Sequence, residues 1–550
     1  MELEKKQCDV LCVGGGIAGL MAAIQASESG AKVMVAEKAN TLRSGKAGMG
    51  NDHFQCYIPE VHGDFDFFWK ELFYGQLAVI LHKMGREYVR YWFENSFDIV
   101  KLWDKWGIPM KYEGKYEFAG HGFPGKQLNH LKYSGINQKP VLTKQALDRG
   151  VEILNRVMVF DLLKGKDASV IGALGISTRE DKLIVFEARA VILGTGSCGG
   201  IYPSVAVGAD NNRGHPLSVS GDGRAMAYRA GVELVDPELT RRHAGPKYFY
   251  RVGQATWVGV LRDRLGKPVG PYLTKPDRRY HDMTIEVNKG IFEEYKNSGK
   301  GPIYMDMNGI SKQDLEYMVH WLKNEGNMGL LNSLQEEGLD LGKLAIEFQT
   351  SDIMVSGGIM ANHRGETSLN GLYAAGDEVW GTISHAAVFG RSAGENAANY
   401  VTKVKAVDVE AEKKTAIEAK KAQLEEIRAR KDGPTWSEAS FALQQIMLDY
   451  CGQVRSENLL GAGLDIVGRL KKKASSGLMA ENAHDLVFCL QTLNLIDIGE
   501  SVLTSAYDRK ETRGLHVRVD YTLTDPLLNN KLHLVKLVEG QPTTTWIEVE

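Results

Sequence analysis

The chain has 550 residues, 43% of them hydrophobic, and a formal net charge of −3. A chain of this length exceeds what one hydrophobic core can organise, so we expect roughly two to four domains. The near-neutral charge argues against a nucleic-acid partner, and six scattered cysteines without a CxxC pair argue against a disulfide framework or a metal or iron–sulfur site within the chain.

The first predicted elements form a βαβ unit. Residues 8–14 have the apolar character of a buried strand, residues 17–29 that of a helix, and residues 32–37 that of a second strand. The turn between the first strand and the helix is a GxGxxG sequence at residues 14–19. In this position the motif is typical of a dinucleotide-binding turn, with the pyrophosphate at the helix N-terminus.

Individual residues of this unit have expected tasks. Gly14 permits the tight turn, Gly16 lets the pyrophosphate approach the backbone, and Gly19 lets the helix pack closely on the strand. Glu37 ends the second strand, where its carboxylate can accept hydrogen bonds from the ribose hydroxyls of an adenosine.

The next elements extend this α/β pattern. Residues 65–107 are predicted to be helical and aromatic-rich, and residues 140–162 to be a helix that leads into a strand. A hairpin-like pair at 168–178 and 182–188 precedes a separate buried strand at 188–193.

The second half of the chain changes character. Residues 210–350 are irregular and rich in glycine, arginine and aromatic residues, which indicates an inserted substrate domain. Residues 350–400 return to a strand–turn–helix pattern. Residues 409–431 and 435–510 are predicted to be helical, and residues 515–550 to form short strands.

Two later strands each end in a small-residue turn: AVILGTG at 190–196 and GLYAAGD at 371–377. An extended FAD needs one turn for its AMP half and others for its flavin half, so these turns favour FAD over NAD. Asp377 is placed to meet the ribityl or pyrophosphate region. The helix after Ser384 can direct its N-terminus at the N1–C2=O edge of the flavin, where negative charge collects on reduction.

Six segments together resemble the fumarate reductase/succinate dehydrogenase flavoprotein family: GGGIAGL, SGDGRAMAYRAGVEL, AVILGTG, GLYAAGD, FGRSAGENAA and RKETRGLHVRVD. They follow the family order over nearly the whole chain. Within the family, LRSGKAGMGN after the second strand and INQKPVLTKQA near residue 136 lean toward the alpha subunit of adenylylsulfate reductase.

The resemblance implies an α/β fold with a Rossmann-type FAD-binding domain, an inserted α+β capping domain and a C-terminal helical domain. The expected boundaries are 1–210 with 350–405 for the discontinuous FAD-binding domain, 211–349 for the capping domain, 406–515 for the helical domain, and 516–550 for a tail of short strands.

The same resemblance, together with the turns described above, implies a set of cofactor-binding residues. They are Gly14, Gly16, Gly19, Glu37, Lys38, Ser44, Gly45, Thr195, Gly196, Asp222, Gly376, Asp377 and Ser384. Membrane-bound relatives attach FAD covalently through a histidine in an R-S-H motif. The matching run here is Arg43-Ser44-Gly45, so we expect FAD to be bound non-covalently.

The substrate side departs from the family pattern. Members that act on succinate and fumarate carry H-P-T, E-G-x-R-G and H-T-M-G-G motifs, whereas this chain has ELTRRH at 238–243, QATWVG at 254–259 and SDIMVSGG at 351–358. The remaining cations can bind carboxylate, sulfate or phosphate oxygens, and a histidine can exchange a proton beside the flavin. The candidate catalytic residues are Arg241, Arg242, His243, His385, Arg391 and Asn51.

The leading hypothesis is an FAD-dependent oxidoreductase that exchanges two electrons between a small anionic substrate and a separate ferredoxin-like iron–sulfur subunit. Organic-acid dehydrogenation or alkene reduction, and adenylylsulfate reduction proper, are both open substrate classes. A flavin electron-transfer subunit without a substrate site is the alternative of a different class, and a stand-alone enzyme that uses NADH is the alternative to the partner.

The start of the chain is polar and does not resemble a signal peptide, and no apolar run approaches the roughly 20 residues of a membrane helix. We therefore expect a cytoplasmic protein without direct membrane insertion.

Overall fold

The structure is a computed structural model. It describes all residues except 73–84, 121–125, 204–215, 217, 242–243, 248–255, 271–272, 280–281, 283, 285–289, 351–353, 407 and 550, and only the backbone of Arg241, Met354 and Glu410.

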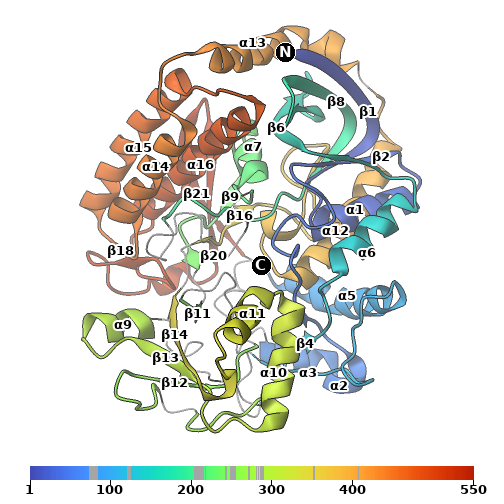
Figure 1. The fold of residues 1–550 in the computed structure, drawn as a ribbon. Coiled ribbons are helices and arrows are strands. Elements are labelled where there is room, and N and C mark those ends of the chain that lie inside the picture. The colour runs from blue at the N-terminus through green and yellow to red at the C-terminus, as the bar shows by residue number, and fades with distance from the viewer. Residues whose placement is uncertain are drawn as a thin grey trace.

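A seven-stranded sheet forms the centre of the nucleotide-binding half of the molecule (Figure 1). Its order is β5-β2-β1-β8-β7-β6, with β17 paired to β8 beyond this path. Strands β5, β2, β1, β8 and β17 are mutually parallel, and β7 is antiparallel to both β8 and β6. The strands are β1 (Glu2–Val13), β2 (Val33–Glu37), β5 (Glu152–Asn155), β6 (Val157–Lys164), β7 (Val170–Ser177), β8 (Lys182–Leu193) and β17 (Leu372–Ala374).

Two strand predictions in this sheet are corrected by the structure. The segments predicted as separate strands at 182–188 and 188–193 form the single strand β8, since no turn residue separates them. The strand predicted to end at residue 162 is two strands, because Arg156 takes a left-handed conformation with φ 64° between β5 and β6. The first strand therefore contacts β8 along its whole length.

The sheet separates two hydrophobic clusters because neighbouring side chains of a strand point to opposite faces. In β1, Val10 and Cys12 join the cluster with the α1 and α12 side chains, whereas Leu11 and Val13 join the cluster with the C-terminal helices. The helices and the small hairpin on the α1 side are α1 (Ile17–Glu28), α2 (Pro59–His62), α3 (Phe65–Glu71), α5 (Arg86–Lys105), α6 (Gln138–Leu147), α12 (Ile383–Val401), β3 (His53–Gln55) and β4 (His130–Lys132).

A helical unit follows the nucleotide-binding half in sequence and packs beside it (Figure 1). It contains α13 (Val409–Ala429), α14 (Trp436–Cys451), α15 (Glu457–Gly477) and α16 (Ala483–Asp508). Within the described residues, α16 is the one helix long and apolar enough to span a membrane, which the sequence analysis does not anticipate, but 78% of its apolar window is buried inside the fold. Because it also contacts α14 and α15, α16 has the environment of a core helix.

The C-terminal strands pair with segments from the middle of the chain. A four-stranded sheet has the order β16-β9-β20-β21. Its members are β9 (Leu234–Val235), β16 (Gly358–Ile359), β20 (Lys531–Val538) and β21 (Gln541–Glu548). Nearby short elements are β18 (Val454–Arg455), β19 (Val517–Arg518) and the 3₁₀ turn η5 (Pro526–Leu528).

The inserted unit has its own core, a cluster that runs from Ala244 to Phe348. Its antiparallel sheet has the order β11-β14-β13-β12. The elements are β11 (Ala244–Pro246), β12 (Val260–Arg262), α9 (Ile291–Asn297), β13 (Ile303–Asp306), α10 (Lys312–Glu325), α11 (Met328–Glu336), the 3₁₀ turn η3 (Leu341–Lys343) and β14 (Ala345–Thr350). In Figure 1 this unit lies at one end of the molecule, below the nucleotide-binding half.

The chain enters and leaves the inserted unit through one strand pair, β10 (Thr240–Arg241) with β15 (Met354–Val355). Helix α7 (Asp222–Ala230) precedes this crossing and packs against β6 and α16, outside the inserted core. We therefore propose that the capping domain begins near residue 240, later than the boundary of 211 drawn from the sequence.

Candidate functional site

The predicted phosphate-binding turn has the geometry that its glycines suggest. Gly14 has φ 97°, and a Cβ on Gly19 would overlap the Gly14 carbonyl oxygen, so both positions need glycine. A Cβ on Gly16 would meet only Gly194 O, at 3.8 Å. The backbone of Gly16 is therefore open to an approaching pyrophosphate at the N-terminus of α1.

Glu37 and a lysine that sequence reasoning did not select hold this turn. The Glu37 carboxylate accepts hydrogen bonds from the backbone N–H of Gly15 at 2.6 Å and of Ala39 at 2.7 Å. Lys139, fully buried on α6, donates to the Gly15 carbonyl oxygen. Burial lowers the pKa of Lys139 to about 8. The residue lies in the INQKPV segment, where no spacing pattern marks it as a partner of the turn.

Asp377 and its neighbour Glu378 follow β17 in the 3₁₀ turn η4 (Gly376–Glu378). Asp377 Oδ2 pairs with Lys46 Nζ at 2.8 Å, which links this turn to the glycine-rich loop of residues 45–50. Glu378 accepts a hydrogen bond from the backbone N–H of Thr195 at 2.9 Å and another from the Thr195 hydroxyl. Burial raises the pKa of Glu378 to about 7. Glu378 thus links the turn at Thr195 to the turn at Asp377, as an extended cofactor requires. Sequence reasoning did not select Glu378.

Lys38 and Asp222, both in the predicted cofactor set, bind each other. Lys38 Nζ lies 2.6 Å from Asp222 Oδ2 and 3.0 Å from Ser220 Oγ. Asn494 of α16 donates to the other Asp222 oxygen at 2.9 Å. The pair joins the end of β2, the start of α7 and the helical unit, and its contact with a cofactor stays a prediction.

The N-terminus of α12 carries Ser384 and His385 within an aromatic cluster. Ser384 Oγ accepts a hydrogen bond from Trp92 Nε1 at 3.0 Å, and His385 Nε2 lies 3.0 Å from the Tyr88 hydroxyl. His385 is fully buried, and burial lowers its pKa to about 3. Burial away from water favours the neutral ring over the charged one, and the catalytic role of His385 stays a prediction.

The other predicted residues are more dispersed. Arg391 Nε donates to Gln25 Oε1 at 2.9 Å, which places its guanidinium at the packing interface of α12 with α1. Ser44 is buried, and no hydrogen-bond partner for its hydroxyl is found among the described residues. The backbone of Arg241 lies in β10, and Arg242 and His243 are outside the described residues. Anion binding by these cations stays a prediction.

A buried polar cluster lies where the hairpin β3–β4 meets the inserted unit. Asp52, fully buried, pairs with Lys132 Nζ at 2.6 Å and with His53 Nδ1 at 2.7 Å. Thr256, from the inserted unit, donates its hydroxyl to Asp52 Oδ2. Asn51 Oδ1 accepts from the backbone N–H of His53 at 3.0 Å. We call Asp52, His53, Lys132 and Thr256 the junction cluster.

The inserted unit also rests on the glycine-rich loop. A Cβ on Gly326, at the end of α10, would come within 2.7 Å of the Met49 carbonyl oxygen, and a Cβ on Gly50 would overlap the Asn324 carbonyl oxygen. The Ser134 hydroxyl donates to the Asn324 side chain. The inserted unit therefore covers the glycine-rich loop, which we expect to run beside the flavin ring, and its role as a cap stays a prediction.

Sequence reasoning selected Asn51 but missed the whole junction cluster. Asp52, Lys132 and Thr256 lie on three chain segments, so no local spacing relates them. The only signal was that Asp52 and His53 directly follow the glycine-rich loop.

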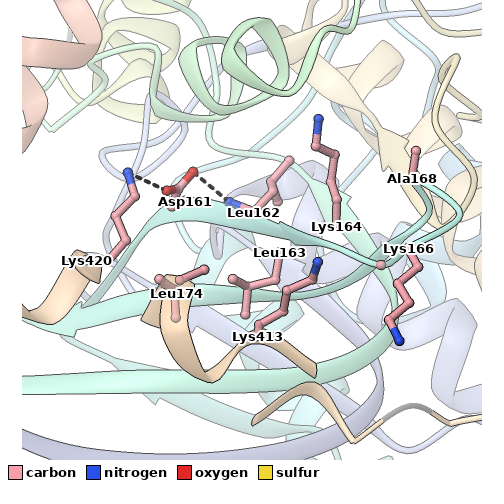
Figure 2. A pocket seen from close by; sticks show the side chains of 11 residues that line it. Asp161, Leu162, Leu163, Lys164, Lys166, Ala168, Leu174, Lys413 and Lys420 are labelled. Atoms are coloured by element: carbon pink, nitrogen blue, oxygen red, sulfur yellow. Dashed lines mark hydrogen bonds and ion pairs between the residues drawn. The ribbon is translucent and has the colours of Figure 1, made fainter. Parts of the chain in front are cut away.

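A hollow of about 380 Å³ in the described surface lies between β6 and α13. Figure 2 shows that its lysines do not converge: Lys420 turns to Asp161, to which it is bonded at 2.8 Å, whereas Lys164 and Lys166 point in different directions. This hollow is lined from a different set of elements than the turns and the junction cluster, and we do not assign it to the site.

The fold and these turns define a flavin-dependent oxidoreductase class, and comparisons with known proteins agree. The family model described as an FAD binding domain matches residues 9–394, and the one described as the fumarate reductase flavoprotein C-terminus matches residues 441–549. The chain belongs to the fumarate reductase flavoprotein family and is an FAD-dependent oxidoreductase. The predictions of fold class, family and FAD are thereby confirmed.

The sequences of named relatives match this chain over nearly its full length. The chain is 25% identical to a subunit of the fumarate reductase (CoM/CoB) of Methanothermobacter marburgensis, over 98% of this chain and 99% of that protein. It is also 25% identical to the L-aspartate oxidase of Vibrio cholerae, over 94% and 96% of the two chains. Among solved structures, adenylylsulfate reductase from Archaeoglobus fulgidus has a TM-score of 0.85 with 20% identity, covering 100% of this chain and 96% of the other. This last likeness concerns the fold.

The residues of this chain fit FAD. Gly16 leaves its backbone open, two small-residue turns meet at Glu378, and the described structure gives buried polar atoms without partners at Ser44 Oγ and His385 Nδ1. Such atoms are costly unless a ligand or water satisfies them.

Proposed function

We propose that the chain exchanges two electrons between FAD and a small organic anion, bound where the cap covers the glycine-rich loop, and passes them to or from a separate iron–sulfur protein. The observation that carries this proposal is the junction cluster. A chain that only relays electrons has no need for a buried lysine–aspartate pair with a partly buried histidine at the interface of cap and flavin domain.

The relatives support the substrate class. Fumarate reductases and L-aspartate oxidases are named for small dicarboxylates, and the matches extend over 94% or more of this chain. Arg241, Arg242 and His243 stand in the sequence at the crossing into the cap, where guanidinium groups can bind carboxylate oxygens in bidentate fashion. Because the fumarate-type motifs are absent at 254–259 and 351–358, the substrate need not be fumarate itself.

Different cofactor-binding residues would contact different parts of the FAD. Gly14, Gly16 and Gly19 would receive the pyrophosphate, and Glu37 the adenosine ribose. Thr195, Gly196, Gly376 and Asp377 would hold the ribityl region, and the N-terminus of α12 would face the flavin. The bound flavin supplies two-electron transfer, and the protein supplies binding, orientation and exclusion of water.

The partner proposal rests on the need of the flavin, after each reaction with substrate, to exchange two electrons with another redox centre. The six cysteines are all buried, and no group of residues suited to a metal is found among the described residues. The Methanothermobacter marburgensis relative is named as one subunit of its enzyme. We further propose a cytoplasmic location.

The test is an anaerobic titration of the purified, FAD-loaded protein, followed by flavin absorbance. The oxidised protein is mixed with succinate or aspartate, the dithionite-reduced protein with fumarate or adenylylsulfate, and each with buffer alone as a blank. We expect at least one organic acid to change the flavin redox state at a rate that saturates with concentration. A response to adenylylsulfate alone would replace the organic-acid proposal by adenylylsulfate reduction, and no response to any probe would favour the electron-relay alternative.

A further inference from the structure

The junction cluster contains an aspartate–histidine pair of the kind used for proton transfer. Asp52 Oδ1 lies 2.7 Å from His53 Nδ1, and the His53 side chain is 26% exposed while that of Asp52 is fully buried. A carboxylate at Nδ1 fixes the ring orientation and tautomer and stabilises the charged ring, which leaves Nε2 as the proton-exchanging atom.

Lys132 helps to keep Asp52 of this aspartate–histidine pair ionised. Burial alone would raise the pKa of Asp52, but Lys132 and His53 hold it far below its ordinary value, so Asp52 is ionised. Lys132 is itself fully buried, and its Nζ lies 5.5 Å from the centroid of the Trp321 ring on α10 of the cap. The ion pair is therefore enclosed between β4 and the cap.

The cap completes the surroundings of His53. Thr256 donates to the Asp52 oxygen that also faces Lys132, and on β4 the ring of His130 lies 5.5 Å from that of His53. Among the described residues, the groups that face the pair include Lys132 and His130 from β4 and Thr256 and Tyr317 from the inserted unit. Asn51, the residue before the cluster, accepts a hydrogen bond from the His53 backbone N–H through its side-chain oxygen.

We infer that His53 exchanges the substrate proton and that Asp52 is its positioning residue, with Lys132 and Thr256 holding Asp52. This inference rests on the proposed function. Reduction of a substrate double bond needs two electrons, delivered with one hydrogen as hydride from the reduced flavin, and one proton. The His53 ring would donate that proton and become neutral; in dehydrogenation the neutral ring would accept the proton, and bound FAD would supply the hydride acceptor.

The first experiment needs no substrate. In the FAD-loaded protein with ¹³C-labelled histidine rings, the His53 signal is identified by its loss in His53→Gln and titrated against pH. The Asp52→Asn substitution removes the carboxylate beside the His53 ring. The pH midpoint at which this ring titrates should therefore fall by about one unit. Retained FAD and a single cooperative melting transition show that the variant is folded, although the transition should lie at a lower temperature because Lys132 loses its buried partner. An unmoved midpoint would overturn the inference.

The second experiment uses the organic acid that responds in the anaerobic titration. His53→Gln should slow the substrate-linked flavin step roughly a hundredfold, and Asp52→Asn should shift its pH profile toward lower pH. His484→Gln, which changes an exposed histidine on α16, should leave rate and profile unchanged. A His53→Gln variant with the wild-type rate and profile would overturn the inference. If no acid responds in the wild-type protein, the proposed function fails, and with it the substrate-proton role of His53.

Discussion

Glu37 illustrates how one side chain both shapes a turn and offers a ligand contact. Its two oxygens accept the Gly15 and Ala39 N–H groups, and each carboxylate oxygen can accept a second hydrogen bond. The contact to the turn explains why an acid at the end of β2 is needed even before a ribose is bound.

We predict that Glu37→Ala weakens FAD binding by about 1.5–3 kcal/mol, because hydrogen bonds to a charged acceptor are lost. Reconstitution of the apoprotein with FAD, followed by flavin fluorescence, measures the dissociation constant. The melting temperature of the FAD-loaded protein should fall as well. Glu28→Gln, at the exposed end of α1, is the matched control. An unchanged dissociation constant would remove Glu37 from the site.

Gly45 is the residue on which the prediction of non-covalent FAD binding rests. It occupies the position of the histidine that attaches FAD in membrane-bound relatives, and it has φ 74° with open space around its Cβ position. We predict that acid precipitation releases all the flavin into the supernatant. Yellow colour that stays with the protein pellet would contradict non-covalent binding.

His533 gives the stability of the protein a pH dependence. Burial alone would lower its pKa, but Glu238 at 3.2 Å and Asp508 at 2.9 Å raise it to about 9. An unfolded histidine has a pKa near 6.5. The folded state therefore binds the proton more tightly, and this stabilisation is complete below pH 6.5 and is lost as the pH rises through 9.

We predict that the free energy of unfolding of the wild-type protein falls by roughly 3 kcal/mol more between pH 6.5 and pH 9.5 than that of His533→Gln. Denaturant unfolding at several pH values measures this difference. His484→Gln, at an exposed position, should follow the wild-type curve. Parallel curves for the wild type and His533→Gln would show that the histidine is not charged in the folded protein.

Among the elements, the packing of α1 on β1 depends on a single small residue. A Cβ on Gly19 would overlap the Gly14 carbonyl oxygen, so a methyl group there would push the helix away from the phosphate-binding turn. Gly468 on α15 offers a contrast, because no atom lies within 4 Å of its Cβ position.

We predict that Gly19→Ala lowers the free energy of unfolding by at least 1–3 kcal/mol and prevents FAD retention. Gly468→Ala should be neutral or stabilise the protein by about 0.5–1 kcal/mol, because alanine loses less backbone entropy in a helix. Unfolding curves and the flavin content of the purified variants give both values. Similar behaviour of the two variants would refute the packing argument.

The elements also show what the sequence could predict. The α1 and β2 elements were predicted within a residue or two because hydrophobic period and glycine spacing are local signals, whereas β1 begins at Glu2, six residues before the predicted strand, because its first half is polar. The single strand β8 was missed because the polar residues Glu187 and Arg189 look like a break, although β8 stays paired with β1 on both sides of them. The junction cluster could not be predicted, since residues 52, 132 and 256 meet only after the cap has folded onto the hairpin.

For the molecule as a whole, the source of the electrons that reset the flavin determines whether the chain works with a partner protein or alone. We predict that purification from the native source yields a complex with a separate iron-containing protein, whose permanent interface would bury roughly 2,000 Å² or more. Iron analysis and stopped-flow mixing with NADH check this. A lone, iron-free chain whose flavin NADH reduces at a catalytic rate would establish the stand-alone alternative.

The central strand β8 has a consequence for synthesis of the chain. β1 pairs with β8 from Glu2–Lys182 to Val13–Leu193, and β17 and α12 complete the sheet only after residue 372. At about 5–20 residues per second, the first strand waits roughly 20–75 seconds on the ribosome for its last neighbours. During that time the apolar side chains of β1 and α1 lack their final cover, and contacts this distant in sequence form slowly. Biogenesis of this protein should therefore depend strongly on chaperones, and a nascent chain that ends before α12 should not retain FAD.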